Sequence, residues 1–198
     1  MRFSQTLNSV MTSVRVTLGC AYQLARLLSK HVGDEVMRYI EACERPTLVG
    51  SNYISLFLAG SINGAPNWQQ RYAGMFEDTD LVLFNPRRPL CDTPYGGAWT
   101  SEEGQRQIDW EHEHLRKAHA ISFWFAAEGQ GFSSALELGT AVERDLPVFV
   151  GVHPMYWKAS TIAYQTKKAR PNIVVVESLA ALANQVRTHF GYAPLKED

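Results

Sequence analysis

The sequence lacks the features that mark a membrane-spanning or disulfide-stabilised protein. No apolar run approaches the roughly 18 residues that a membrane span needs, because Arg15 and Arg26 interrupt the only candidate region. We therefore expect no membrane partner. The three cysteines, Cys20, Cys43 and Cys91, form an odd-numbered set without metal-ligand spacing. We predict free thiols and a cytoplasmic location, since a reducing compartment tolerates such a set.

Neither sign of charge is in excess. Lys and Arg number 19 and Asp and Glu number 20, which leaves a net charge of −1. Without a positive field to hold a polyphosphate backbone, a nucleic acid polymer is not an expected partner. With 45% hydrophobic and 20% charged residues, disordered and collagen-like classes are excluded. At 198 residues, the chain is long enough to form one domain with its own core.

Acidic residues are absent from the first 33 residues, which hold four basic ones. This balance is that of a mitochondrial transit peptide, and a targeting remnant is one interpretation. The other is a packing helix, which we favour because apolar residues recur there at helical spacing: Leu7, Val10, Met11, Val14 and Leu18. A second helical stretch is predicted from Asp34 to near Pro46. Residues 1–50 are thus predicted to form an N-terminal helical extension and residues 51–198 the main domain.

From Ile54 onward, short apolar runs alternate with amphipathic stretches. The runs, typical of buried parallel strands, are Ile54–Ala59, Leu81–Phe84, Ala120–Phe125, Pro147–Val152 and Ile173–Val176. The predicted helices are Trp68–Phe76, Glu103–Ala118, Ser134–Arg144, a short one after Trp157, and Ser178–Phe190. This alternation predicts an α/β fold: a flavodoxin-like or Rossmann-like three-layer sandwich with a five-stranded parallel sheet.

Polar and glycine-rich residues follow the predicted strands, where open α/β sheets bind ligands. These segments are Gly60–Gly64, Asn85–Arg88, Glu128–Gly131 and His153–Pro154. Neither GxGxxG nor GxxxxGK[ST] follows the first strand, which argues against a dinucleotide fold or a P-loop. We expect a small-molecule ligand and no cofactor. The loop Leu90–Glu102, which holds Trp99, is a candidate lid.

One carboxylate falls on the inward side of the predicted helix at 103–118. Three residues define the inward stripe at about 100° per residue: Ile108, Leu115 and Ala118. Glu111 lies in the middle of this stripe. Burial raises the pKa of an uncompensated acid, so Glu111 is a candidate proton donor near neutral pH. The alternative is an ion pair with Arg87 or Arg88, and spacing alone does not decide.

The same helix offers a weaker metal-site pattern. Glu111 and His114 are three residues apart, as in metal-binding helical bundles. Such bundles need two of these pairs, and the chain has only one. We therefore predict no metal site and assign His112 and Glu113 to a solvated face.

A second carboxylate, Glu137, has two interpretations. Ser134 and Glu137 have the spacing of a capping box, which is a structural role. The same position puts Glu137 in the first helical turn, where the helix dipole lowers the pKa and keeps the carboxylate nucleophilic. The presence of both Glu111 and Glu137 favours a catalytic role, since one acid is expected to have a raised pKa and the other a lowered pKa. Carboxyl groups about 5 Å apart suit retaining glycoside cleavage, and a wider gap suits inversion.

Six segments occur in a characteristic order and spacing: Phe57–Ile62, Trp68–Gln69, Asn85–Arg88, Gln107 with Trp110–Glu111, Phe123–Phe125 and Leu136–Gly139. Together they resemble the nucleoside 2-deoxyribosyltransferase-like family over roughly Ile54 to Val186. The resemblance implies a flavodoxin-like fold that cleaves the N-glycosidic bond of a (deoxy)nucleoside and transfers the sugar to another base. It also implies a homo-oligomer, a dimer or larger.

Roles for particular residues follow from the resemblance. It places Glu137 as the nucleophile that attacks the anomeric carbon, and Glu111 as the acid that serves the leaving base. Gly60, Ser61 and Ile62 match the loop that closes over sugar and base. Further residues expected to contact the substrate are Trp68, Asn85, Arg87, Arg88, Gln107, Ser133 and Ser134.

Substrate choice stays open in the sequence. Gly131 stands six residues before Glu137, where relatives carry a side chain that contacts the sugar or phosphate. Ser133, Ser134 and Arg71 are an alternative set for a 5′-phosphate, helped by the helix N-terminus. The alternatives to sugar transfer are therefore a hydrolase acting on nucleoside 5′-monophosphates and a nucleotide-binding module without turnover.

Overall fold

The computed structural model describes residues 36–44, 53–88 and 101–196. The strands are β1 (Arg38–Glu41), β2 (Ser55–Gly60), β3 (Val82–Asn85), β4 (Ala120–Phe125), β5 (Val148–Val152) and β6 (Val175–Val176). The helices are α2 (Trp68–Ala73), continued by the 3₁₀ turn η1 (Gly74–Phe76), α3 (Glu102–Lys117), α4 (Phe132–Ala141), α5 (Ala159–Ala169) and α6 (Leu179–His189). The predicted N-terminal helix and Trp99 of the predicted lid lie outside the described residues.

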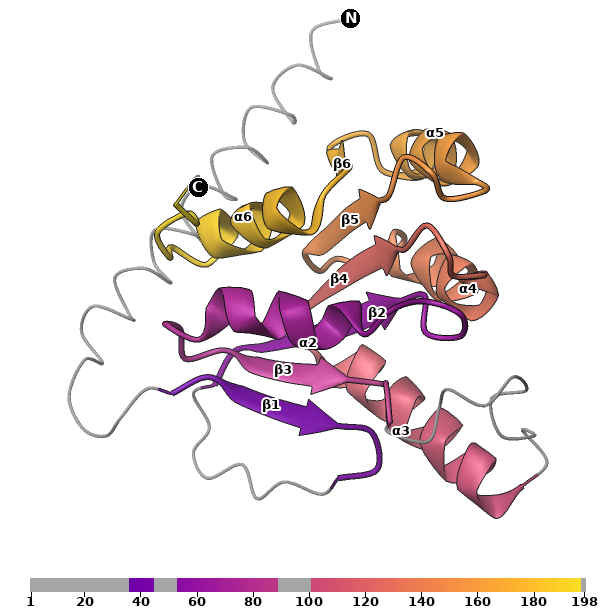
Figure 1. Cartoon of the computed structure of the whole chain (residues 1–198), viewed down its shortest axis with the longest axis vertical. Coiled ribbons are helices and arrows are strands. Elements are labelled where there is room, and N and C mark those ends of the chain that lie inside the picture. The colour runs from indigo at the N-terminus through magenta and orange to yellow at the C-terminus, as the bar shows by residue number, and fades with distance from the viewer. Residues whose placement is uncertain (1–35, 45–52, 89–100, 197–198) are drawn as a thin grey trace, which may run out of the picture. The chain divides into compact units, whose positions relative to one another are not determined.

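The strands form one parallel sheet in the order β1-β3-β2-β4-β5-β6 (Figure 1). From β3 to β6 this order is that of a flavodoxin-like sheet, in which the chain starts near the middle and winds outward on both sides. The predicted fold class is confirmed. The predicted strand count is wrong, because the sheet has six strands in the described part of the chain rather than five.

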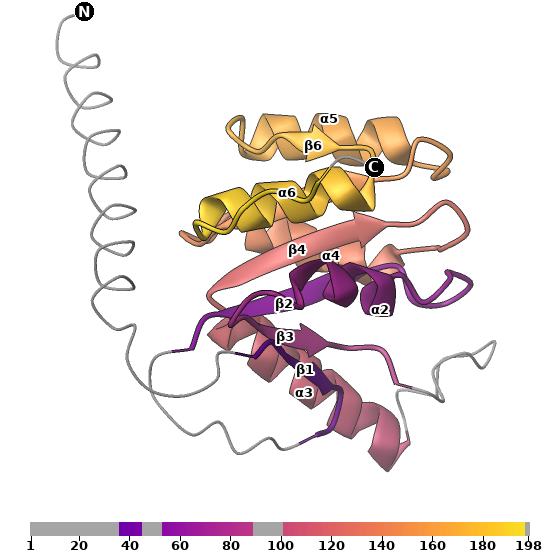
Figure 2. The ribbon, with the colours of Figure 1, turned by 60° about the vertical axis from the view of Figure 1, so that its left-hand side comes forward.

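The additional strand is β1, at the edge of the sheet beside β3 (Figure 2). It occupies part of the stretch from Asp34 to near Pro46 for which a helix is predicted, and that prediction is wrong at Arg38–Glu41. Of its four residues only Ile40 is buried, while Arg38 is exposed and Tyr39 and Glu41 are half-buried. An edge strand is half-exposed, so it has no continuous apolar run to mark it.

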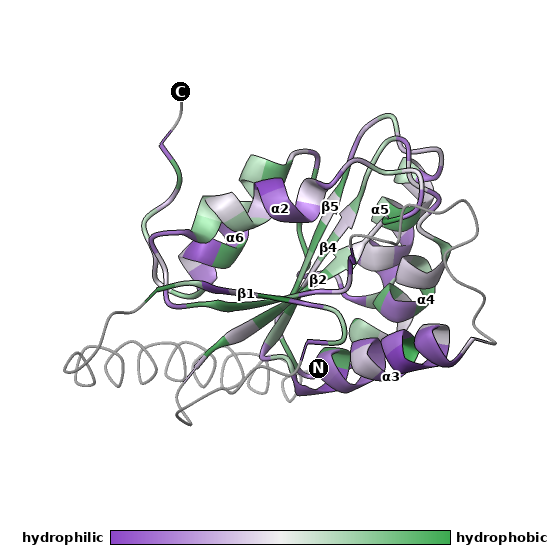
Figure 3. Cartoon of the chain, turned by 60° about the horizontal axis from the view of Figure 1, so that its bottom comes forward, coloured by the Kyte–Doolittle hydropathy of each residue, from purple (hydrophilic) through white to green (hydrophobic). Residues whose placement is uncertain are grey.

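Helices cover both faces of the sheet (Figure 3). One apolar core joins the sheet to α3, α4 and α5, and includes Trp110 and Leu138. The other joins it to α2 and α6, and includes Trp68, Tyr72 and Leu182. The central strands β2 and β4 are buried along their whole length, which explains why their apolar runs are unbroken in the sequence.

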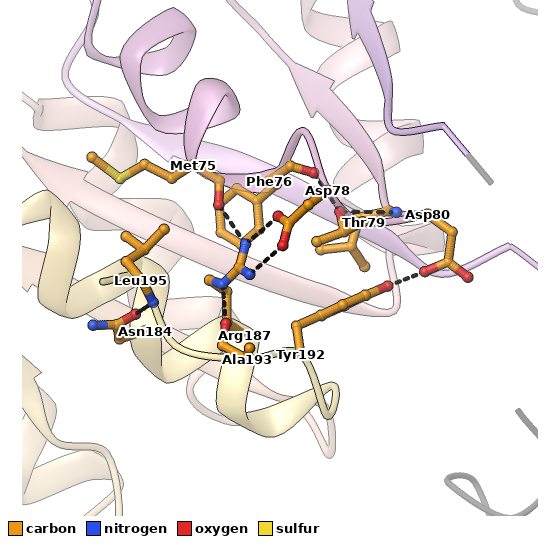
Figure 4. A network of polar contacts seen from close by, with 11 residues as sticks. Met75, Phe76, Asp78, Thr79, Asp80, Asn184, Arg187, Tyr192, Ala193 and Leu195 are labelled. Atoms are coloured by element: carbon orange, nitrogen blue, oxygen red, sulfur yellow. Dashed lines mark hydrogen bonds and ion pairs between the residues drawn. The ribbon is translucent and has the colours of Figure 1, made fainter. Parts of the chain in front are cut away.

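Polar contacts tie the end of α6 to the segment before β3 (Figure 4). The Arg187 guanidinium donates to both carboxylate oxygens of Asp78, each at 2.7 Å, and to the carbonyl of Met75. The Tyr192 hydroxyl donates to Asp80. Asp80 lies two residues before the start of β3, so this network lies at the amino end of that strand, opposite the edge where the strands end.

Candidate active site

The strand order reverses between β2 and β4, and the loops after these two strands meet there. The Ser61 backbone N–H donates to the Trp124 carbonyl at 3.0 Å. A Cβ added at Gly129 would lie 2.2 Å from the Cβ of Ser61, so only glycine allows this approach. In flavodoxin-like sheets this point of reversal is where ligands bind.

The loop after β2 is held by a hydrogen bond from Trp68, the first residue of α2. The indole Nε1 donates to the Ser61 carbonyl at 2.7 Å, and the ring is buried in the core under α2. Trp68 therefore supports the loop. Gly60 ends β2, and Ile62 is half-buried. The side chain of Ser61 is fully buried, and its Oγ has no hydrogen-bond partner among the residues that the structure describes.

Helix α4 begins two residues earlier than predicted. Its N-cap is Gly131 in the left-handed conformation, φ +63°, without a side-chain cap. The predicted capping box is therefore wrong, because Ser134 and Glu137 both lie inside the helix and no acid lies in its first turn. Ser133 is exposed at this turn and Ser134 is buried. Glycine adopts this left-handed conformation without strain, but it offers no side chain to accept from the first N–H groups of the helix.

Glu137 is half-buried on α4. Burial raises its pKa to about 7, and the negative charge of Glu111 contributes to the rise. The predicted lowering is wrong in direction, because Glu137 lies beyond the first turn, where the helix dipole has faded. The loss of hydration and the neighbouring carboxylate then dominate.

Glu111 is half-buried on α3, one residue from the core side chain Trp110. Burial raises its pKa, as predicted, while a hydrogen bond from Gln107 and the charge of Arg88 act in the opposite direction. Gln107 Nε2 donates to Glu111 Oε1 at 2.8 Å and to the Pro86 carbonyl at 3.1 Å. Gln107 thus fixes the acid to the end of β3.

The helix register around Glu111 differs from the predicted stripe at one position. Ile108 is 40% exposed, while Leu115 is half-buried and Ala118 is buried. Gln107 faces inward instead of Ile108 and contacts Glu111 one turn later. The four-residue spacing of Gln107 and Glu111 is the sequence signal for this contact, since residues four apart meet on a helix.

The two acids act on each other from neighbouring helices. Both α3 and α4 pack on the same face of the sheet. The Arg144 guanidinium, beyond the end of α4, donates to the carbonyls of Leu115 and Arg116 on α3. The charge of Glu111 reaches Glu137 strongly enough to raise its pKa. Pairs of interacting carboxyl groups recur in sites of acid–base and nucleophilic chemistry.

The two arginines after β3 contact elements on opposite faces of the sheet, Arg87 the loop before α2 and Arg88 the helix α3. Arg87 is buried, and its guanidinium donates to the carbonyls of Ala65 and Pro66 at 3.1 and 3.0 Å. Asn85 supports it by accepting from the Arg87 backbone N–H at 2.9 Å. Arg88 is the arginine whose charge acts on Glu111, and it forms a 2.6 Å ion pair with Glu103.

No metal site is found in the part of the chain that the structure describes, where no three His, Cys, Asp or Glu side chains are grouped to hold an ion. His112 is exposed, and Glu113 pairs with Lys117. Cys43 is a free, exposed thiol. None of the helices within the described ranges has the length and apolar character that crossing a membrane requires.

The fold and the acid pair define a class, namely flavodoxin-like α/β proteins with two interacting carboxyl groups on neighbouring helices of one face of the sheet. A family model described as nucleoside 2-deoxyribosyltransferase like matches residues 53–156, more than half of the chain. The chain therefore belongs to the nucleoside 2-deoxyribosyltransferase-like family, as its motifs indicate. The match includes both acids and leaves β1 and α6 outside. A comparison with curated proteins finds no match.

Proposed function

We propose that the protein cleaves the N-glycosidic bond of a deoxynucleoside and transfers the sugar to another base. The observation that carries the proposal is the interaction of Glu111 and Glu137 from adjacent helices, beside the strand ends of a family fold. Membership supports activity of the deoxyribosyltransferase kind on a small nucleoside-like molecule. The particular reaction and the residue roles are our proposal.

In the first step a Glu137 carboxylate oxygen attacks the anomeric carbon while the bond from that carbon to the base nitrogen breaks. Glu111 gives its proton to the departing nitrogen. In the second step an acceptor base attacks the same carbon, Glu111 takes the proton from the acceptor, and Glu137 is released. A carboxylate suits this role because it captures a sugar cation that is too reactive to be left free.

These roles require a proton on Glu111 and none on Glu137. Burial raises both pKa values, that of Glu137 to about 7, and the charge of Glu111 adds to the rise at Glu137. The two groups therefore compete for protons, because ionising both leaves two like charges in a poorly hydrated site. The proposed reactive form carries its proton on Glu111. Gln107 holds Glu111 in place for its transfer.

The loop after β2 and the start of α4 are proposed to bind the sugar. Ser61 supports this proposal, because its buried Oγ has no hydrogen-bond partner among the described residues. This atom lies close to Gly131 at the start of α4, only 3.0 Å from the point where a Cβ of Gly131 would be. Oligomer assembly and a cytoplasmic location stay proposals. Family resemblance supports the first and the free thiol of Cys43 supports the second.

Hydrolysis of a nucleoside 5′-monophosphate is the second candidate. The start of α4 supports it, since no side chain caps its N-terminus and the exposed Ser133 lies in its first turn. Free N–H groups at a helix start favour a phosphate.

One incubation separates the candidates. The protein is mixed with a deoxynucleoside, or its 5′-monophosphate, and a free acceptor base, and the products are separated by chromatography. Base exchange supports transfer, and free base with free sugar or sugar phosphate supports hydrolysis. Saturable binding without products contradicts both and indicates a binding module.

A further inference from the structure

The edge strand β1 lies outside the residues that the family model matches, yet one of its side chains reaches the strand ends. Tyr39 pairs with Leu83 of β3 in the sheet register, and its half-buried ring packs against the core under α2 and α6. Its hydroxyl accepts a hydrogen bond from Asn85 Nδ2 at 2.6 Å.

This hydrogen bond completes the partners of a buried amide. Asn85 is 1% exposed. Its Oδ1 accepts from the Arg87 backbone N–H at 2.9 Å, so the other side of the amide, Nδ2, faces Tyr39 and the Arg87 carbonyl at 3.2 Å. Tyr39 therefore helps to hold the turn from Asn85 to Arg87 in one conformation, because a buried amide that loses a partner cannot replace it with water.

Arg87 links the turn after β3 to the loop after β2 through hydrogen bonds. Its two guanidinium nitrogens donate separately to the carbonyls of Ala65 and Pro66, and such a fork fixes both position and direction. The same loop begins with Ser61 and Ile62, for which we propose substrate contact. A continuous path of hydrogen bonds thus joins Tyr39 to the loop.

We propose that Tyr39 is a positioning residue, which sets the affinity of the site for its substrate by holding the loop after β2 through Asn85 and Arg87. The inference rests on the proposed function, since substrate affinity is its readout. The path runs on the α2 side of the sheet, whereas Glu111 and Glu137 lie on helices of the other side. Loss of the Tyr39 hydroxyl should therefore weaken binding without changing the protonation of the acid pair.

The test compares Tyr39→Phe with Tyr192→Phe, which removes a hydroxyl donor to Asp80 at the opposite end of β3. Tyr39→Phe is expected to raise the KM for the deoxynucleoside roughly 3- to 10-fold, the range that one buried hydrogen bond allows. The kcat and the pH profile should stay as in the wild type, and Tyr192→Phe should leave KM unchanged. KM is independent of enzyme concentration, so partial unfolding of a variant does not hide the result.

An unchanged KM in Tyr39→Phe, or an equal rise in Tyr192→Phe, overturns the inference. The path through Arg87 is tested in an Arg87→Lys background, where lysine cannot fork to both carbonyls. Tyr39→Phe should then add less than about a twofold rise, because the connection is already broken. If Tyr39→Phe raises KM by the same factor in the Arg87→Lys background as in the wild type, the path through Arg87 is overturned.

The two proposals fail differently. An active wild type with an unaffected Tyr39→Phe variant contradicts the inference alone. A wild type that binds deoxynucleosides without turnover contradicts the proposed function, and Kd then replaces KM in the same comparison. A wild type that neither binds nor converts deoxynucleosides contradicts both.

Discussion

Glu137 is a half-buried acid whose environment opposes its charge. Its folded pKa of about 7 exceeds the ordinary value of 4.5 for glutamate, because burial and the Glu111 carboxylate both disfavour ionisation. The folded state therefore binds more protons than the unfolded state between these two pH values. The free energy of unfolding therefore falls as pH rises from about 4.5 to about 7, and it stays lower by this amount above pH 7. Such a cost is expected at a functional position, where activity and stability conflict.

Glu137→Gln removes this cost while it removes the nucleophile. We expect the variant to unfold with a free energy up to roughly 3 kcal/mol larger than the wild type at pH 8, and with almost no difference at pH 4. Urea unfolding at the two pH values measures the change, and the same variant should show no base exchange. If the variant were as stable as the wild type at both pH values, or if it still exchanged bases, the role of Glu137 would be contradicted.

Glu111→Gln separates proton donation from nucleophilic attack. Turnover of ordinary deoxynucleosides should fall roughly 10²- to 10⁴-fold, the range for loss of a general acid. A nitrophenyl deoxyriboside, whose leaving group needs no proton, should still release nitrophenolate. Loss of the Glu111 charge should also lower the pKa of Glu137, but burial, the larger cause, stays.

The acidic limb of the pH profile with the activated substrate therefore moves to lower pH in Glu111→Gln. An equal loss of rate with both substrates would argue that Glu111 only maintains the structure. A limb that stays in place would argue that the two carboxyl groups do not interact.

The direction of the Glu111 pKa was predictable from the sequence, but that of Glu137 was not. Glu111 lies among inward-facing positions of one helix, so helical periodicity alone indicates its burial. The pKa of Glu137 depends on where α4 begins and on how α4 packs beside α3. The first is decided by the left-handed conformation of Gly131, and the second is a long-range contact that no local spacing records.

The loops after β2 and β4 approach each other through a glycine. Gly129→Ala would place a Cβ 2.2 Å from the Cβ of Ser61, so one loop must move. We expect a loss of roughly 1–3 kcal/mol in the free energy of unfolding and a rise in KM, since Ser61 moves with its loop. Thermal unfolding and steady-state kinetics measure the two effects.

Gly139→Ala is the matched control for stability, because a Cβ there meets nothing within 4 Å and the residue lies inside α4. This variant should gain roughly 0.5–1 kcal/mol from the helix preference of alanine. A Gly129→Ala variant as stable as the wild type would show that the two loops are not in close contact.

The buried elements were predictable and the edge element was not. The run at 120–125 coincides with β4, and the 159–169 helix lies where a shorter one is predicted. Strands covered by helices on both faces read as continuous apolar runs. β1 reads Arg-Tyr-Ile-Glu and is partly exposed, so its place in the sheet depends on pairing with β3, which sequence periodicity does not reveal.

Across the whole domain, the proposed site draws its residues from both faces of the sheet. The acid pair belongs to the α3 and α4 face, and the Tyr39, Asn85 and Arg87 path belongs to the α2 face. The sequence predicted a site at the strand ends, because topology alone brings these loops together. It did not assign Arg87 and Arg88 to opposite faces, since adjacent residues diverge only once the turn after β3 has its conformation.

The covalent intermediate on Glu137 gives the most direct test of the account. The wild-type protein is incubated with a deoxynucleoside in the absence of an acceptor base, quenched in acid and analysed by intact and peptide mass spectrometry. A deoxyribosyl adduct on Glu137, absent from Glu137→Gln and discharged by added base, is the predicted result. Base release by the wild type without any adduct, or an adduct on another residue, would contradict the account.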